Sequence, residues 1–284
     1  MALYATDGEE VVFALKAAPN HSYRCLECRL PVKVRRGKNR IPHFYHLRTS
    51  PSCHLYSKSE DHLLLQLQLK KCFPENELKI EEYIPSVCRI ADLLWEKEKI
   101  VFEIQCSSLE ASEAKQRIID YRKSGYEIVW LFDDRLFNKR LVRPAEELLR
   151  ADSCYYFSFN RFGNSLIYDQ FEIIIAKNRV RKSRPMNVNL MIPRKIPSLE
   201  WPSHLIEQIQ KKLAHCQRFF QGDVIHKTIL SAIYPSASQT LEKWFSIEQE
   251  MKKLHRPPGL LETVTKECVV YSYLDILEWF LTKD

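Results

Sequence analysis

Two short apolar runs, joined by the charged tetrapeptide EKEK, lie near the middle of the chain in RIADLLWEKEKIVFEIQCSS, residues 89–108. Each run has the length and the apolar content of a strand, and each carries one carboxylate in its interior, Asp92 or Glu103. An ionised carboxylate in apolar surroundings is costly unless it is paired or bound to a metal. The pattern therefore predicts two largely buried strands whose acidic residues need a partner.

The hydrophobic pattern also predicts the neighbouring elements. SEDHLLLQLQLKKCF is expected to form a helix that is capped by Ser59 and has Glu60 and Asp61 in its first turn. LKIEEYI is predicted to be a strand, SLEASEAKQRIIDYRKSGY a helix that ends near Gly125, and EIVWLF a further strand. A hairpin followed by a helical crossover predicts an α/β (α+β) fold with a mixed sheet flanked by helices.

Three regions follow from this pattern. Residues 1–56 hold a cysteine and histidine cluster among short strands, and residues 57–180 form the mixed sheet with its helices. Residues 181–284 carry helical periodicity, for example in HLIEQIQKKLAHCQRFF, and are predicted to be a helical C-terminal region. The basic segment KNRVRKSRP, residues 177–185, is predicted to be a linker.

The EKEK turn sets the register of the predicted hairpin. A two-residue turn at Lys97 and Glu98 pairs Glu96 with Lys99, and a four-residue loop keeps the same register. Counting four residues outward from Glu96 and Lys99 brings Asp92 opposite Glu103. Their Cβ atoms are then about 4.5–5.5 Å apart. Gln105 lies on the same face as Glu103, because side chains alternate along a strand. An odd-length loop would instead separate the two carboxylates.

Two facing carboxylates repel each other unless a positive charge lies between them. Mg²⁺ takes oxygen ligands and is often held by one or two carboxylates together with waters and substrate phosphate. We therefore expect Asp92 and Glu103 to hold Mg²⁺ or Mn²⁺, and to repel each other when no metal is bound. The alternative is a solvated hairpin face on which both are ordinary polar residues.

A second candidate metal site lies in RCLECRLPVKVRRGKNRIPHFYH. Cys25 and Cys28 form a Cys-x2-Cys pair, and His43 and His46 form a His-x2-His pair. Two thiolates and two imidazoles suit structural Zn²⁺, and the hairpin-like linker between the pairs favours a ribbon over a DNA-reading finger. Cys53 and His54 lie nearby and can replace a ligand if His43 is a core residue. The alternative is a reduced cysteine pair with unrelated histidines.

The order of these motifs resembles that of the PD-(D/E)XK nuclease superfamily. RIADLL, VFEIQCSSL, the Arg117-x3-Tyr121 spacing, GYEIVWLF and the N-terminal cluster together resemble the competence protein CoiA family, over roughly residues 20–135. The resemblance implies a metal-dependent nuclease fold that acts in DNA uptake, transformation or recombination. It supports the same four zinc positions.

Carried over by position, the resemblance implies metal ligation by Asp92 and Glu103. Glu60 matches the acidic residue of the preceding helix, and His62, Arg117 and Tyr121 take supporting places. Gln105 stands where many superfamily members have a lysine. Gln105 can donate hydrogen bonds but carries no charge, so Lys115 or Arg117 would have to supply the missing positive charge.

Two functions fit this resemblance. The first is a Mg²⁺-dependent nuclease that hydrolyses phosphodiester bonds of single-stranded or branched DNA, with recombination or uptake proteins recruited by the C-terminal helices. The second is a DNA-binding scaffold that keeps the nuclease fold without its chemistry.

Composition changes this picture little. The net charge of +7 is compatible with nucleic acid, and the basic residues at 35–40 can contact phosphates or simply be solvated. Nine cysteines, an odd number scattered among apolar residues, favour a reduced, cytoplasmic protein. No apolar run reaches the length of a membrane span, so membrane insertion is not expected.

Overall fold

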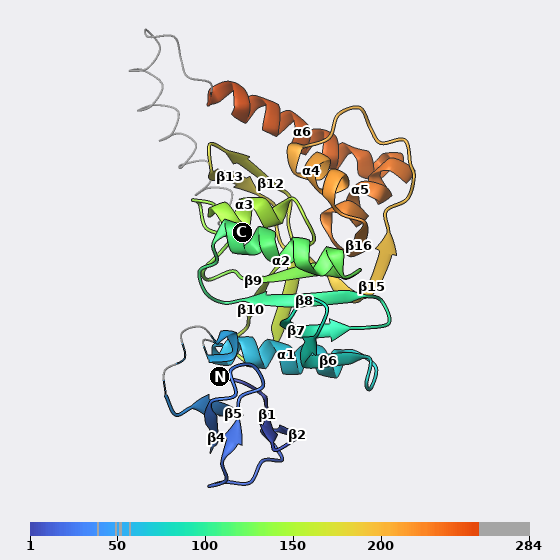
Figure 1. The fold of residues 1–284 in the computed structure, drawn as a ribbon. Coiled ribbons are helices and arrows are strands. Elements are labelled where there is room, and N and C mark those ends of the chain that lie inside the picture. Colours follow the sequence, from blue (N-terminus) through green and yellow to red (C-terminus); the bar gives the residue numbers. More distant parts are fainter. Residues whose placement is uncertain (39, 49, 51–52, 57, 256–284) are drawn as a thin grey trace, which may run out of the picture.

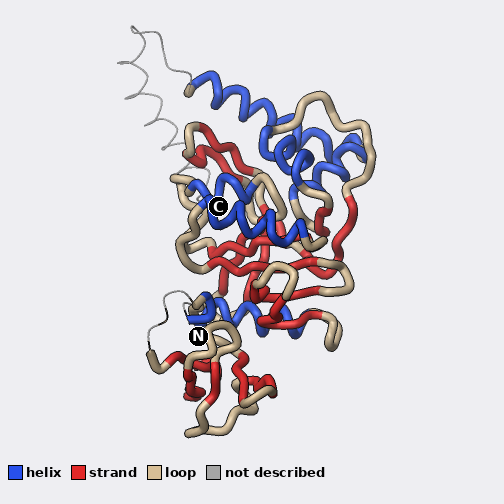
Figure 2. Tube along the Cα trace, viewed as in Figure 1, coloured by secondary structure: helices blue, strands red, loops and turns tan. Residues whose placement is uncertain are grey.

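The computed structural model describes residues 1–38, 40–48, 50, 53–56 and 58–255 (Figure 1). These residues form an N-terminal module of strands and loops, a central sheet with helices on both faces, and a C-terminal part built mainly of helices (Figure 2). Residues 256–284, predicted to belong to the helical region, lie outside the described residues. Among the described helices, none combines the length and the apolar character needed to cross a membrane.

The N-terminal module is a five-stranded antiparallel sheet of order β2-β1-β3-β4-β5. Its strands are β1 (Tyr4–Asp7), β2 (Glu10–Phe13), β3 (Tyr23–Arg24), β4 (Pro31–Gly37) and β5 (Arg40–His46). A short 3-10 helix, η1 (His54–Tyr56), leads from the module towards the central sheet. The buried core of the module is small and includes four alanines, Ala2, Ala5, Ala14 and Ala17.

The central sheet has seven strands in the order β14-β11-β10-β9-β8-β7-β6. They are β6 (Leu78–Ile84), β7 (Arg89–Trp95), β8 (Ile100–Gln105), β9 (Glu127–Asp133), β10 (Cys154–Phe159), β11 (Ser165–Asp169) and β14 (Met186–Asn187). β9 runs parallel to both of its neighbours, and the other pairs are antiparallel. The predicted mixed sheet is therefore confirmed.

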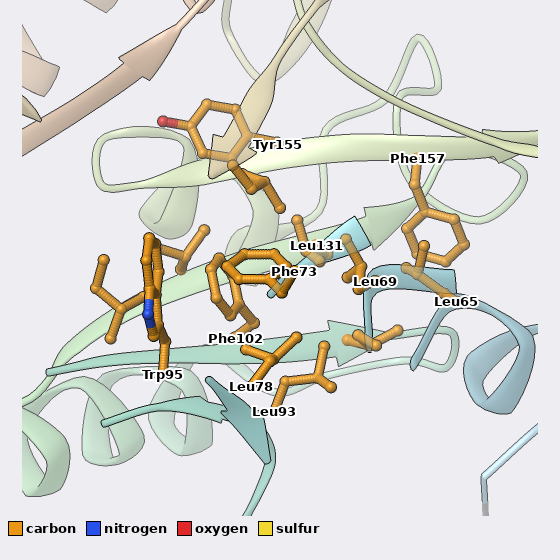
Figure 3. Close-up of a cluster of buried hydrophobic side chains, with 14 of the residues drawn as sticks. Leu65, Leu69, Phe73, Leu78, Leu93, Trp95, Phe102, Leu131, Tyr155 and Phe157 are labelled. Atoms are coloured by element: carbon orange, nitrogen blue, oxygen red, sulfur yellow. The ribbon is translucent and has the colours of Figure 1, made fainter. Parts of the chain in front are cut away.

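Helices α1 (Glu60–Cys72), α2 (Ala111–Lys123) and α3 (Pro144–Arg150) cover the two faces of this sheet. Leu65, Leu69 and Phe73 from the α1 segment pack onto Phe102 and other apolar side chains of the sheet (Figure 3). Every residue of β8 is buried, because the strand is central and both of its faces are covered. This explains why the sequence there is nearly continuously apolar.

Helix α1 begins where the sequence predicts it to begin. Ser59 is the N-cap, and its hydroxyl accepts a hydrogen bond from the backbone N–H of His62 at 3.2 Å. This cap fixes the first turn of α1, in which the ring of His62 lies 3.0 Å from Asp92.

The rest of the chain adds strands as well as helices. The helices are α4 (Glu207–His215), α5 (Val224–Ile233) and α6 (Pro235–Leu254). The strands are β12 (Glu172–Ile175), β13 (Asn178–Lys182), β15 (Asn189–Lys195) and β16 (Arg218–Gln221). The predicted linker at 177–185 is wrong, because residues 178–182 pair with β12 as a hairpin.

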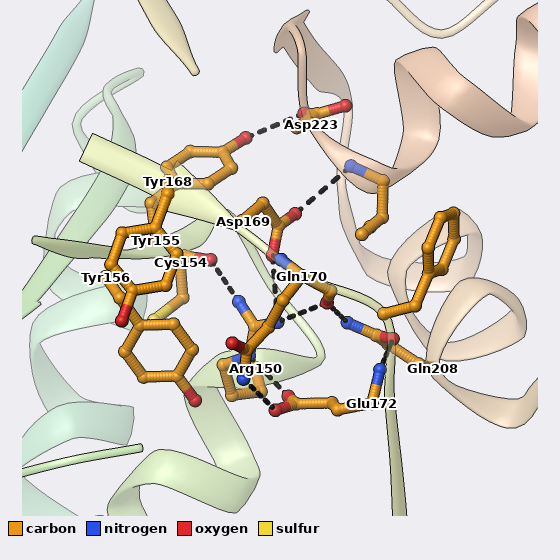
Figure 4. Close-up of polar contacts among 12 residues, drawn as sticks. Arg150, Cys154, Tyr155, Tyr156, Tyr168, Asp169, Gln170, Glu172, Gln208 and Asp223 are labelled. Carbon is orange, nitrogen blue, oxygen red and sulfur yellow. Dashed lines mark hydrogen bonds and ion pairs between the residues drawn. The ribbon is translucent and has the colours of Figure 1, made fainter. Parts of the chain in front are cut away.

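A buried polar network joins α3, the β12–β13 hairpin and α4 (Figure 4). Arg150 donates hydrogen bonds to Glu172 at 2.6 Å and to Asp169 at 2.8 Å. Arg179 pairs with the same Glu172 and with Glu146. Each buried charge therefore has an oppositely charged partner, as buried ions require, and the network has a structural role in holding these segments together.

Candidate active site and metal centre

Three carboxylates occupy opposed positions across the neighbouring strands β6, β7 and β8. The pairs Leu93–Phe102, Leu94–Val101 and Trp95–Ile100 continue to Asp92 opposite Glu103, which is the register predicted from the EKEK turn. On the other side of β7, Ile80 pairs with Leu93 and Glu82 with Ala91, so Glu81 is opposite Asp92. Glu81, Asp92 and Glu103 are only 4%, 7% and 5% exposed.

The carboxylate of Asp92 is held by positive and polar groups. Its Oδ1 lies 2.7 Å from Nζ of Lys58 and 3.0 Å from Nε2 of His62, and its Oδ2 accepts a hydrogen bond from the backbone N–H of Ile104 at 2.9 Å. Burial alone would raise the pKa of Asp92, but His62 and Lys58 outweigh it and hold the pKa well below its usual value. Asp92 is therefore ionised at neutral pH.

Glu103 is held from the opposite side by α2. One oxygen accepts a hydrogen bond from Arg117 at 2.8 Å, and the other accepts one from the hydroxyl of Tyr121 at 2.9 Å. Burial and the nearby charge of Asp92 raise the pKa of Glu103 despite the Arg117 guanidinium. Arg117 and Tyr121, expected to support the site, thus contact one of its two carboxylates directly.

These side chains line a cleft of about 1620 Å³ that runs between the N-terminal module and the central sheet. Asp92, Glu103 and Gln105 contribute to its lining from the sheet, and Lys58 and His62 from the start of α1. Tyr4, Thr6 and Arg29 line it from the N-terminal module. Both halves of the structure therefore build the same cleft.

The structure places two predicted site residues differently from expectation. Glu60 is exposed and accepts a hydrogen bond from the backbone N–H of Ile41 at 3.3 Å, outside the lining of the cleft. It lies one residue after its helix cap, and the face it occupies is turned towards β5. Gln105 does line the cleft, but its amide group donates to the backbone carbonyl of Ser107 at 2.8 Å. Lys115 is exposed and does not line the cleft.

Lys58 and Glu81 were missed by sequence reasoning. Glu81 was within reach, because counting outward across the PSVC turn that joins β6 to β7 brings it opposite Asp92, just as the EKEK turn brings Glu103 there. No local sequence pattern marked Lys58 as a site residue, since it precedes the helix cap in a loop. Its place in the cleft depends on how the N-terminal module packs against the sheet.

The expected repulsion among the carboxylates is largely neutralised by the protein itself. Lys58 lies between Glu81 and Asp92, at 3.2 Å and 2.7 Å, and Arg117 lies between Glu103 and Glu113. Among the ion pairs of the described residues, no side-chain cation bridges Asp92 and Glu103. Each oxygen of this pair already accepts a hydrogen bond or ion pair from the protein, so a divalent cation bound between Asp92 and Glu103 would use the remaining lone pairs of these oxygens.

The predicted cysteine and histidine cluster is present with one candidate ligand exchanged. Ligand atoms of Cys25, Cys28, His46 and Cys53 all lie within 4.8 Å of one another, so this cluster can hold a structural zinc. The sulfurs of Cys25 and Cys53 are 3.7 Å apart, and Nε2 of His46 lies 3.2 Å and 3.6 Å from the sulfurs of Cys28 and Cys53. Tetrahedral zinc requires about 3.8 Å between two sulfurs and about 3.6 Å between sulfur and nitrogen.

His43 is not part of this cluster. Positions three apart on a strand point to opposite faces, so His43 and His46 on β5 cannot both face the same ion. The ring of His43 is buried instead, with Nδ1 2.7 Å from the backbone carbonyl of Ile41. The cluster is therefore of the three-cysteine, one-histidine type, and Cys53 takes the place that was predicted for His43.

One of the basic residues predicted for phosphate contact has a structural role. The guanidinium of Arg36 donates to the backbone carbonyls of Ala14, Leu15 and Ala17, the second at 2.8 Å. Arg35 lies over the ring of Tyr45, 4.6 Å from its centroid. The tip of the β4–β5 hairpin therefore uses part of its positive charge within the module.

Most of the mixed sheet, including its buried acidic row, lies within a region that matches a known family. Residues 58–170 match the family model described as competence protein CoiA, nuclease-like domain, and residues 10–56 match competence protein CoiA, N-terminal domain. The chain belongs to the competence protein CoiA family. Comparisons with curated proteins and with solved structures give no significant match.

Proposed function

We propose that the chain is a Mg²⁺-dependent DNA phosphodiester hydrolase of the PD-(D/E)XK type that acts in competence. The observation that carries the proposal is the pair Asp92 and Glu103, buried side by side in the cleft, where no cation of the described residues bridges them. The family membership supports a role linked to competence.

Each residue of the centre has a task in this proposal. Asp92 and Glu103 would hold the metal, which when bound polarises the phosphodiester and lowers the pKa of an attacking water. The backbone N–H of Ile104, Arg117 and Tyr121 keep the two carboxylates in place. Lys58 supplies the positive charge that Gln105 lacks, because its ammonium group reaches the cleft beside Asp92.

His62 is a candidate for proton transfer in the same centre. Burial lowers its pKa more strongly than the Asp92 carboxylate raises it, so its ring is neutral at neutral pH. A neutral imidazole can accept a proton from water. Its Nε2 lies 3.0 Å from the ionised Asp92 carboxylate and so carries the ring proton, which leaves Nδ1 as the nitrogen that would accept a proton.

Cleavage of labelled DNA tests the proposal. Single-stranded, duplex and branched DNA, with RNA for comparison, would be incubated with Mg²⁺ or Mn²⁺ and with a chelator. Glu103→Gln is expected to lower the rate at least about a hundredfold, because a metal ligand is worth several kcal/mol in the transition state. Glu96→Gln is the matched control, since Glu96 is exposed, pairs with Lys79 at 2.6 Å and does not line the cleft.

The second candidate is DNA binding without cleavage, and the engaged amide of Gln105 favours it. In that case no metal supports cleavage, while DNA binding persists in Glu103→Gln and weakens steeply with salt. Salt-sensitive binding by a protein that never cuts DNA would overturn the enzymatic proposal.

Metal binding should also depend on pH through Glu103. A protonated carboxyl group does not bind Mn²⁺, and the raised pKa of Glu103 moves its protonation above the ordinary value of 4.5. We expect Mn²⁺ affinity, measured by titration without DNA, to fall as the pH is lowered towards that value. Arg117→Met should shift the curve to higher pH, because it removes a charge that lowers the pKa.

Arg122→Met is the control for this titration. Arg122 lies on the same helix but pairs with Asp152, outside the cleft. The assignment of Glu103 as a metal ligand fails if the parent and Arg117→Met give the same curve.

A further inference from the structure

The linker from the zinc cluster to helix α1 carries Lys58 into the cleft. Cys53 belongs to the cluster, Leu55 is buried in the core of the N-terminal module, and Lys58 follows directly before the Ser59 cap. Only five positions separate Cys53 from Lys58. The position of Lys58 is therefore tied to the module at the start of this linker.

Glu81 provides a second connection between the N-terminal module and Lys58. The carboxylate of Glu81 accepts hydrogen bonds from the backbone N–H groups of Leu3 and Tyr4, each at 3.1 Å, at the start of β1. The same carboxylate lies 3.2 Å from Nζ of Lys58. Glu81 thus connects the first strand of the N-terminal module to the cation beside Asp92.

The backbone of Glu81 has a strained conformation, which indicates that its surroundings hold this residue in place. Its φ of 52° lies in the left-handed region, although Glu81 is within strand β6 and is not a glycine. Such a conformation is unfavourable for a residue other than glycine and persists only where the surroundings hold it. Here the backbone N–H groups of Leu3 and Tyr4 and the ammonium group of Lys58 hold the side chain of Glu81.

The result is a buried ammonium group with two carboxylate partners. The side chain of Lys58 is only 6% exposed, which is rare for lysine unless it is paired. Lys58 lies between Glu81 of β6 and Asp92 of β7, and both strands belong to the central sheet. The N-terminal module binds Glu81, one of these two partners. It also anchors the start of the linker that carries Lys58.

We propose that Glu81 is a positioning residue, and that the zinc-loaded N-terminal module, through Glu81 and Cys53, holds Lys58 against Asp92 and so completes the catalytic centre. The part of the proposal that concerns catalysis rests on the proposed nuclease function. The positioning itself concerns only the folded chain. The N-terminal module then contributes to the catalytic centre by positioning Lys58, in addition to any contact it makes with nucleic acid.

Lysine labelling tests the positioning directly. The parent, Glu81→Gln and Glu82→Gln would be treated briefly with an amine-reactive acylating reagent, and the labelled lysines identified by mass spectrometry. Each protein would be tested as purified, after zinc chelation, and after zinc is added back. We expect Lys58 to be protected in the parent and labelled about tenfold faster in Glu81→Gln and in the zinc-free parent, because its local opening becomes easier.

Two other lysines serve as internal controls. Lys212 is 1% exposed and donates to the backbone carbonyl of Asp152 at 2.9 Å, so it should stay protected in every sample. Lys79 has a side chain that is 42% exposed and should be labelled in every sample. Glu82→Gln should behave as the parent.

A catalytic readout separates positioning from general stability. If DNA is cleaved, Glu81→Gln should lower kcat about tenfold with little change in KM, because the DNA-binding surface is intact. The proposal is overturned if Lys58 stays as protected as Lys212 in Glu81→Gln and in the zinc-free parent. Because labelling needs no cleavage, this failure is distinguishable from failure of the nuclease function.

Discussion

Replacing Asp92 with asparagine is expected to lower the melting temperature in metal-free buffer and to abolish metal-dependent cleavage. The substitution removes one of the two carboxylates that pair with the buried Lys58, and with it the charged oxygen that accepts a hydrogen bond from the N–H of Ile104. Breaking a buried ion pair from one side costs about 3–5 kcal/mol. In a protein of this size, the melting temperature should fall by roughly 5–8 °C.

This result reverses the expectation from sequence, in which removing one of two repelling carboxylates leaves stability unchanged or improves it. The difference arises because Lys58 and His62 surround Asp92 and hold its pKa below the ordinary value of 3.8. A depressed carboxyl pKa contributes stability above the ordinary pKa, and this contribution is lost as the pH falls below it. The gap between parent and Asp92→Asn should therefore be present at neutral pH and narrow in acid.

Asp120→Asn is a suitable control for thermal melting. Asp120 also pairs with an arginine, Arg89, at 2.9 Å, but near the surface, where such a pair contributes at most about 1 kcal/mol. Lys58→Met, made alone and together with Asp92→Asn, measures the coupling between the two charges. A melting temperature of Asp92→Asn equal to or above that of the parent would show that repulsion dominates.

Replacing Cys53 with serine is expected to remove the zinc and to unfold the N-terminal module. The purified parent should contain about one zinc per chain, as a four-ligand site predicts. A structural zinc contributes on the order of 10 kcal/mol to folding. The module core contains four alanines among its buried apolar residues and is too small to replace that energy.

His43→Asn distinguishes the two possible ligand sets. His43 was the fourth ligand expected from sequence, but its Nδ1 lies against the carbonyl of Ile41, where an asparagine amide can donate in its place. Metal analysis should therefore find the zinc retained in His43→Asn and lost in Cys53→Ser. Loss of zinc from His43→Asn, with retention in Cys53→Ser, would restore the sequence-based ligand set.

Short-range sequence patterns determined several features of the fold and of the candidate site. Strand alternation and the even turn at EKEK set the register that brings Asp92 opposite Glu103, because a hairpin register depends only on the turn and its two strands. The cap at Ser59 and the Cys-x2-Cys pair are likewise short-range features. Even the pairing of Glu81 with Asp92 follows from the PSVC turn, although sequence reasoning did not extend the count that far.

The tertiary structure decided which residues from distant segments meet. Cys53 joins the zinc cluster only because the chain after β5 folds back onto the module, and Lys58 reaches Asp92 only because that module packs against the central sheet. Glu60 has the right type and sequence position, but the packing of α1 against β5 turns it away from the cleft. Such contacts close long loops, and their geometry depends on the packing of whole elements. No spacing along the chain encodes them.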